Sequence, residues 1–102
     1  MRAEVLHIEE CPSWHEAGRS LRAALDSIGH RDVPITFTLL ASAMEASRVP
    51  FGGSPTILVD GKDLFPTDGR TSDLACRVYL TPNGLAGRPT QHQLETALAA
   101  HD

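Results

Sequence analysis

The feature that most constrains this chain is an apolar run that leads directly into a helical pattern. Residues 3–9 (AEVLHIE) contain the almost continuously apolar stretch VLHI, which is typical of a central strand. Residues 13–29 repeat apolar residues at spacings of three and four, which predicts an amphipathic helix that stops at Gly29. Residues 35–40 (ITFTLL) are rich in β-branched and aromatic residues and predict a second strand. A strand, a helix and a strand in this order form a right-handed unit with parallel strands.

Three further stretches, up to residue 89, predict a short helix, a hairpin and an irregular insert. Residues 41–48 predict a short helix that ends before a proline. Residues 56–65 (TILVDGKDLF) predict a hairpin that turns at Asp60 and Gly61, with its second strand reaching the end of the stretch. Residues 66–89 are rich in glycine and proline and predict an irregular insert, interrupted by one order-prone island, LACRVYL.

The order of these elements predicts the fold class. Ser13 with Glu16 and Thr90 with Gln93 are expected to form capping boxes, the second opening a final helix. The order is then β-α-β-α-β-β-α, and the hairpin makes the four-stranded sheet mixed. We expect an α/β protein, a three-layer α/β/α sandwich with an irregular insert before the last helix. The 102 residues are near the commonest domain size, so residues 1–102 are expected to form a single domain.

The composition argues against several classes of function. The net charge is −4 and no basic patch interleaved with aromatic residues is present, so we expect no nucleic-acid partner. No apolar run reaches the roughly 18 residues of a membrane span, and the N-terminus turns acidic before a signal-peptide core. We therefore expect no membrane partner and a cytoplasmic location, where thiols are mostly reduced. Two cysteines in that compartment favour buried, catalytic or metal-binding roles over a structural disulfide.

Cys11 lies between the first predicted strand and the first predicted helix, in the stretch ECPSWHE. The first amides of a helix have no internal partner and carry partial positive charge, which lowers the pKa of a thiol placed there. Cys11 is therefore a candidate nucleophile, with a small buried packing residue as the alternative. Trp14 stands where a C-x-x-C pair would have its second cysteine, and its inward position favours a core role over a substrate platform.

Other titratable residues have simpler interpretations. His7 alternates with Val5 on the first strand and is expected to be a core histidine with satisfied hydrogen bonds rather than a base. Asp60 and Asp63 of the hairpin are expected to be solvated. No zinc-ligand spacing, dinucleotide-binding motif or phosphate-binding loop is present, so we predict no cofactor and no dedicated metal site.

The chain resembles thioredoxin-like proteins in three features. These are Cys11-Pro12 at the end of the first strand, GGSPTILVDG opening the third, and the order of the elements. The resemblance covers about residues 3–65 well and implies a cis peptide bond before Pro55, facing the active cysteine. A narrower resemblance is to small actinobacterial thioredoxin-like proteins with GSPT, CR-Y and TP-GL-G-P patterns. Proteins of this kind are sometimes labelled alkylmercury lyases or (seleno)proteins.

The resemblance also implies a substrate site beside Cys11. A cis bond would turn the backbone of Ser54 toward Cys11 and offer its amide and carbonyl to an extended thiol substrate. This sequence departs from thioredoxin at Trp14, which stands in place of the second cysteine of the usual pair. Dithiol exchange by that route is therefore excluded, whereas monothiol chemistry is still open to Cys11. The candidate substrate-binding residues are Pro12, Ser13, Trp14, Ser54, Pro55 and Thr56.

Cys76 is a second candidate because of the topology that the resemblance implies. The third strand runs away from Cys11, and the hairpin brings the chain back, so Phe65 lies at the Cys11 end of the sheet. We predict that the Cα of Cys76 lies within roughly 12 Å of that of Cys11. Cys76 could then resolve a mixed disulfide or join a two-thiolate metal site. The alternative is a small apolar residue packed over the sheet edge.

Three functional hypotheses follow from these residues. The first is a thiol-dependent redox protein, of the thiol–disulfide oxidoreductase or thiol reductase type, with Cys11 as catalytic nucleophile and Cys76 as resolving thiol. Its partners would be low-molecular-weight thiols or protein disulfides. The second is a protein that binds a soft metal or an organomercurial between Cys11 and Cys76. The third is a non-enzymatic interaction module whose exposed edge strand pairs with a partner or with a second copy as a homodimer.

Overall fold

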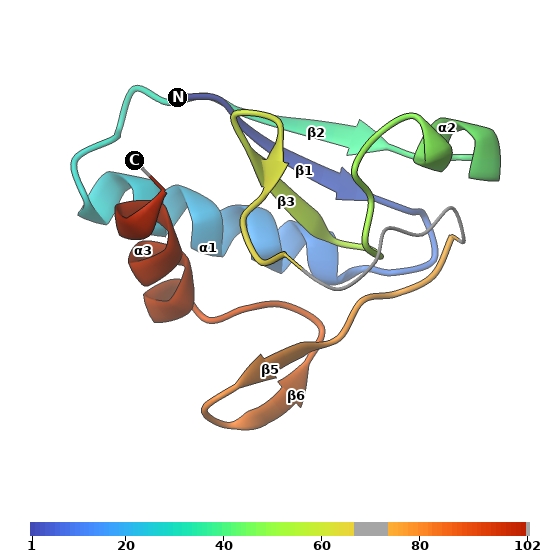
Figure 1. The fold of residues 1–102 in the computed structure, drawn as a ribbon. Coiled ribbons are helices and arrows are strands. Elements are labelled where there is room, and N and C mark those ends of the chain that lie inside the picture. Colours follow the sequence, from blue (N-terminus) through green and yellow to red (C-terminus); the bar gives the residue numbers. More distant parts are fainter. Residues whose placement is uncertain (67–73, 102) are drawn as a thin grey trace.

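The computed structural model of the chain describes residues 1–66 and 74–101, and Figure 1 shows its α/β fold. A four-stranded sheet has the order β2-β1-β3-β4, and a separate pair, β5-β6, forms a hairpin. The mixed α/β class and the four-stranded mixed sheet are as the sequence predicts. The elements are β1 (Ala3–His7), α1 (Ser13–Ser27), β2 (Ile35–Leu39), α2 (Ala43–Ser47), β3 (Thr56–Val59), β4 (Lys62–Asp63), β5 (Tyr79–Thr81), β6 (Gly84–Ala86) and α3 (Gln91–Ala100).

The central strand β1 determines the arrangement of the sheet. It pairs in parallel with β2 and antiparallel with β3, so that Val5 lies between Phe37 and Ile57. The predicted parallel β1-α1-β2 unit is confirmed. The hairpin of β3 and β4 is also confirmed, but β4 ends at Asp63, two residues before the expected end. The N–H of Leu64 still donates to the carbonyl of Ile57 (2.9 Å), but the N–H of Phe65 donates to the Asp63 carboxylate (2.9 Å) in a local turn.

Hydrophobic residues pack on both faces of the sheet because β1 and β3 are buried along almost their whole length. α1 and α3 lie together on one face (Figure 1), whereas the short α2 contributes Ala46 to the other. The cluster on the α1 and α3 face contains Ala3, Val5, Leu21, Ala24, Leu25, Val33, Ile57, Val59, Leu94 and Leu98. The second cluster, on the opposite face, contains Leu6, Ile8, Cys11, Leu40, Ala46, Phe51 and Leu58.

The helix ends follow local sequence signals only in part. Gly29 follows α1 with a φ of +92°, as expected for a glycine stop, and the capping box at Thr90 is confirmed. The capping box expected of Ser13 and Glu16 is wrong, because Pro12 is the N-cap and Ser13 already lies inside α1. Within the described residues, no helix combines the length and the apolar character needed to cross a membrane.

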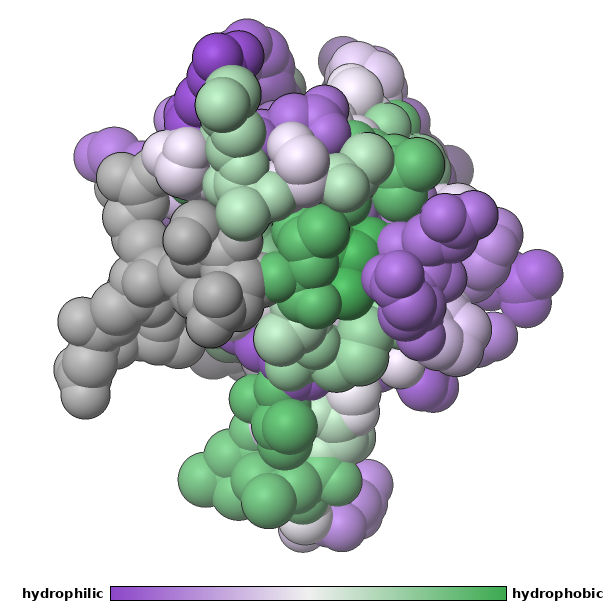
Figure 2. Space-filling view, turned by 90° about the vertical axis from the view of Figure 1, so that its right-hand side faces the viewer, coloured by the Kyte–Doolittle hydropathy of each residue, from purple (hydrophilic) through white to green (hydrophobic). Residues whose placement is uncertain are grey.

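The insert of residues 66–89, expected to be irregular, contains the β5-β6 hairpin, which projects at the bottom of the molecule in Figures 1 and 2. Residues 67–73 of this insert lie outside the described residues. A two-residue turn joins the strands, and Thr81 closes it by donating a hydrogen bond to the carbonyl of Gly84 (2.6 Å). The exposed side chains of Val78, Leu80 and Leu85 make this part of the surface hydrophobic (Figure 2).

Candidate functional site

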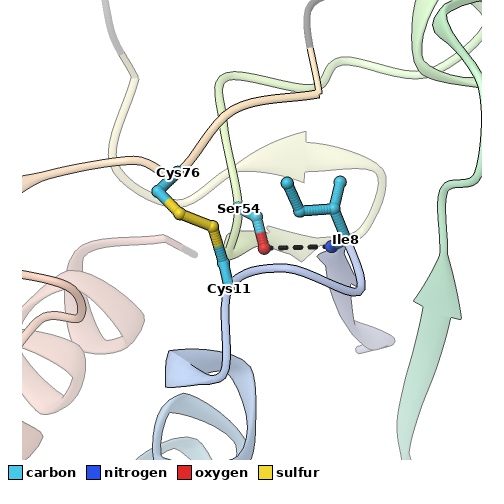
Figure 3. The surroundings of a disulfide bond; sticks show 4 residues. All are labelled: Ile8, Cys11, Ser54 and Cys76. Atoms are coloured by element: carbon cyan, nitrogen blue, oxygen red, sulfur yellow. Dashed lines mark hydrogen bonds between the residues drawn. A yellow bond between two sulfur atoms is a disulfide. The ribbon is translucent and has the colours of Figure 1, made fainter.

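Cys11 and Cys76 form a disulfide, which Figure 3 shows beside Ser54. Their Cα atoms are 5.9 Å apart, so the predicted approach of the two cysteines is confirmed. This separation lies inside the range of roughly 4.4–6.8 Å that disulfides require. The two residues differ in accessibility, because Cys11 is only 2% exposed whereas Cys76 is exposed. The disulfide therefore joins a buried residue to a surface residue.

The position of Cys11 follows from the β1-α1 connection. β1 ends at His7, and the chain turns through Cys11 into Pro12, the N-cap of α1. No side chain caps this helix start; the N–H of His15 donates to the carbonyl of Pro12 (3.4 Å), which leaves the N–H groups of Ser13 and Trp14 to a nearby ligand or to solvent. Cys11 itself packs in the second cluster with Ile8 and Phe51. Cys11 is thus a buried packing residue, and it also lies at the helix start where a nucleophilic cysteine was expected.

The loop before β3 contains the expected cis peptide bond, between Ser54 and Pro55. The Ser54 side chain accepts a hydrogen bond from the N–H of Ile8 (3.0 Å; Figure 3), which ties this loop to the end of β1. The Ser54 N–H donates to the carbonyl of Ala75, and its carbonyl accepts from the N–H of Arg77, both at 2.8 Å. Ser54 and Cys76 are thereby paired as in a parallel sheet. The two backbone groups expected to bind a substrate are bonded to the chain itself.

The residues that flank Ser54 are built into the loop. Pro55 and Thr56 are buried. The Thr56 hydroxyl accepts a hydrogen bond from the N–H of Gly52 (3.0 Å) and donates one to the carbonyl of Gly53 (2.5 Å). The carbonyl of Pro55 accepts a hydrogen bond from the hydroxyl of Tyr79 (2.5 Å). These contacts give Pro55 and Thr56 a positioning role for the loop.

Arg77 holds residues 74–78, called here the Cys76 segment, against the body of the protein. Its buried guanidinium forms an ion pair with Asp63 (2.8 Å) and donates a hydrogen bond to the carbonyl of Phe65. It also lies over the ring of Tyr79, 4.6 Å from the ring centroid. Burial raises the pKa of the Tyr79 hydroxyl, with Arg77 opposing the shift, so the phenol keeps the proton that it donates to Pro55. These contacts hold the chain that follows Cys76, whereas Ala75 before it is held by the N–H of Ser54.

The sequence reasoning missed this role of Arg77. The expectation that Asp63 is solvated is wrong, because its carboxylate is half-buried against Arg77; Asp60 is exposed, as expected. The CR-Y pattern was the available signal, since it places Arg77 and Tyr79 on the same side of an extended chain. The 14-residue separation of Arg77 from Asp63 leaves no local pattern that would have joined them.

A stack of three aromatic rings joins the end of β1 to the start of α1. Trp14 is half-buried and packs between His7 and His15, with ring centroids 4.0 and 3.7 Å away. His7 is buried, as expected, but its Nδ1 has no hydrogen-bond partner. Desolvation lowers the pKa of His7, an effect that the backbone of Ile8 partly opposes and His15 reinforces. The expectation of a fully satisfied core histidine is therefore wrong for this atom.

The remaining candidates lie around the start of α1. Pro12 is exposed, and Ser13 is half-buried, close to Gly87, where an added Cβ would be 2.5 Å from the Ser13 hydroxyl. Trp14 instead lines a shallow cavity of about 680 Å³ between α1 and β2, together with Phe37 and Arg19. Of the six candidate residues, Ser54, Pro55 and Thr56 thus lie in or next to the loop before β3, Pro12 and Ser13 lie at the start of α1, and Trp14 lines this groove.

A metal site in the described part of the chain would have few ligands. Among residues 1–66 and 74–101, no group of three or more His, Cys, Asp or Glu side chains could hold an ion. A metal at this position would be coordinated by the two sulfur atoms of the reduced cysteines. No protein-family model, curated protein or solved structure matches this chain. The chemistry of the site therefore has to be argued from its geometry.

Proposed function

We propose that this protein is a thiol–disulfide redox protein with a thioredoxin-like, three-layer fold, in which Cys11 and Cys76 form the reactive couple. The observation that carries this proposal is the disulfide between a cysteine preceding a helix N-terminus and a cysteine paired with the residue before a cis-proline. The parallel β1-α1-β2 unit and the following β3-β4 hairpin support the fold assignment.

The chemistry is a two-electron exchange with a partner dithiol or two thiols. The partner gives two electrons and two protons to the disulfide, which becomes the thiols of Cys11 and Cys76, and the partner becomes a disulfide. In the opposite direction, the Cys11 thiolate is the internal nucleophile that forms the Cys11–Cys76 disulfide again. The uncapped start of α1 stabilises that thiolate through its unpaired amides.

A purely structural disulfide is the main competing interpretation. The bond joins residues 65 apart, and closing a loop of this length stabilises a protein by about 4 kcal/mol in the chain-entropy model. However, the Cys76 segment is also attached through Arg77 and Tyr79, which do not depend on the sulfur atoms. We therefore expect reduction to leave the segment docked and the protein folded, as a redox couple requires.

The test is equilibration of the native protein in glutathione buffers of graded redox potential. Free thiols are then alkylated and counted by mass. We expect a reversible transition in which the two thiols appear together, and we expect it to be absent in Cys11→Ser and in Cys76→Ser. A disulfide that becomes reducible only when denaturant unfolds the chain would contradict the proposal.

A soft-metal site is a second candidate, because the 5.9 Å Cα separation would let both reduced sulfurs contact one ion. Titration of the reduced protein with mercuric ion should then give one tight site per chain, lost in either single serine variant. Binding that survives Cys76→Ser would exclude this candidate. An unchanged cellular function in the double serine variant would instead favour the interaction module.

A further inference from the structure

The two sulfurs of the disulfide are not equivalent toward an incoming thiol. Cys11 is 2% exposed, and its neighbours in the second cluster include Ile8, Leu40 and Phe51. Cys76 is an exposed residue of a surface segment. A thiolate attacks one sulfur from the side opposite the other, and Cys11 has almost no exposed surface through which an incoming thiol could reach it. Cys76 does have exposed surface.

The geometry points to Cys76 as the sulfur that exchanges with partners, and to Cys11 as the internal sulfur. This reverses the roles expected from the sequence, and it rests on the proposed redox function. The partner class is a molecule that presents a thiolate, or its disulfide. In the reducing direction, the partner sulfur bonds to Cys76 Sγ, the Cys11–Cys76 bond breaks, and its electron pair leaves on Cys11 Sγ. A second partner thiol then releases Cys76 as a thiolate and forms the partner disulfide.

The leaving group favours the same direction. Thiol–disulfide exchange is faster when the departing sulfur is the better stabilised thiolate. Cys11 directly precedes Pro12, the N-cap of α1, where unpaired backbone amides stabilise negative charge. Cys76 belongs to an extended segment paired with Ser54 and not to the connection that leads into a helix. Accessibility and leaving-group stability therefore both select attack at Cys76.

Because the Cys76 segment is attached independently of the disulfide, Cys76 remains the exchanging residue and Cys11 the internal one after reduction. Ser54 bonds to both neighbours of Cys76, and Arg77 is tied to Asp63 without any contribution from sulfur. Cys11 thus remains covered, and oxidation begins with a mixed disulfide at Cys76 that Cys11 attacks. The occupied Ser54 backbone also leaves no place for a partner strand at this position, so the partner needs only to reach the exposed residue Cys76.

The first test uses the oxidised wild-type protein. Brief reaction with glutathione, an acid quench and peptide mapping should place glutathione on Cys76 in at least about tenfold excess over Cys11. A parallel reaction with reduced thioredoxin, quenched in the same way, asks whether a protein thiol attacks the same sulfur. The faster of the two reactions identifies the source of the thiol. Adducts mainly on Cys11, or equally on both cysteines, would overturn the inference.

The second test compares the reduced single variants. Cys76 in Cys11→Ser should react with dithiodipyridine at least about tenfold faster than Cys11 in Cys76→Ser, although Cys11 has the better stabilised thiolate. A faster Cys11 would overturn the inference. Circular dichroism checks the fold of both variants, and the wild-type mapping decides if either is unfolded. Failure of the redox proposal itself would appear differently, as a disulfide that resists reduction in the native protein.

Discussion

At the scale of single residues, Gly53 sets how closely the Cys76 segment approaches the loop before β3. Its φ is +109°, a conformation that side chains other than glycine rarely adopt. A Cβ added there would lie 2.8 Å from the Cβ and 3.1 Å from the Cα of Arg77. Backbone conformation and space therefore both require glycine at this position.

The variant Gly53→Ala should destabilise the protein by about 2–4 kcal/mol, because it combines backbone strain with a clash against Arg77. The matched control is Gly61→Ala, at a φ of +82° with no atom within 4 Å of the added Cβ. The control should lose only about 1–2 kcal/mol from strain alone. Equal losses in the two variants, measured by urea unfolding, would show that the contact with Arg77 is unimportant.

The environment of His7 predicts how the stability of the protein depends on pH. Its pKa is lowered in the folded protein by burial, so the unfolded chain takes up a proton at a higher pH than the folded one. Stability should therefore be fully present above about pH 6.5 and fall as the pH drops below it. His7→Phe keeps a ring against Trp14 and removes the unpaired Nδ1.

We expect His7→Phe to weaken the loss of stability between about pH 7 and pH 5 and to raise the unfolding free energy at low pH by about 1 kcal/mol. The control is His92→Gln on the exposed surface of α3, which should keep the wild-type slope. Urea unfolding at a series of pH values measures both variants. If the unfolding free energy of His7→Phe fell with decreasing pH as steeply as that of the wild type, other groups would be responsible for the acid sensitivity.

At the scale of elements, the sequence predicts best where a pattern is long and local. VLHI, the apolar spacing of α1 and the TILV strand indicate β1, α1 and β3 correctly, because the two strands are buried along almost their whole length and the helix buries one repeated face. β5 and β6 are three residues each, too short for a period to show. The pairing of Ser54 with Cys76 was also beyond sequence reasoning, since it depends on the path of the insert. The candidate residues were found, but not the contacts that already occupy Ser54.

The Cys76 segment should loosen when its ion pair is removed. Arg77→Met leaves the half-buried Asp63 without its partner and should cost about 3–5 kcal/mol. Amide exchange at Ser54 should quicken more than exchange in β1. The control is Arg88→Met, whose pair with Glu16 is exposed and 4.0 Å long, and which should leave stability nearly unchanged. Unchanged exchange at Ser54 in Arg77→Met would mean that the disulfide alone fixes the segment.

At the scale of the whole molecule, three regions far apart in sequence meet at one end of the sheet. The β1-α1 turn supplies Cys11, the loop before β3 supplies Ser54, and the insert supplies Cys76 (Figure 3). Arg77 attaches the insert to β4 through Asp63, and Tyr79 attaches it to Pro55. The disulfide is therefore one of several links between the insert and the sheet, and the proposed redox function depends on the other links holding when the disulfide opens.

The most direct test of this account is a titration of the native protein with dithiothreitol, followed by two-dimensional amide NMR. We predict two well-dispersed spectra, oxidised and reduced, with the N–H groups of Ser54 and Arg77 protected from hydrogen exchange in both. Chemical shifts should change most around Cys11 and Cys76. A reduced spectrum with the narrow dispersion of an unfolded chain, or complete loss of protection at Ser54 and Arg77, would contradict the account.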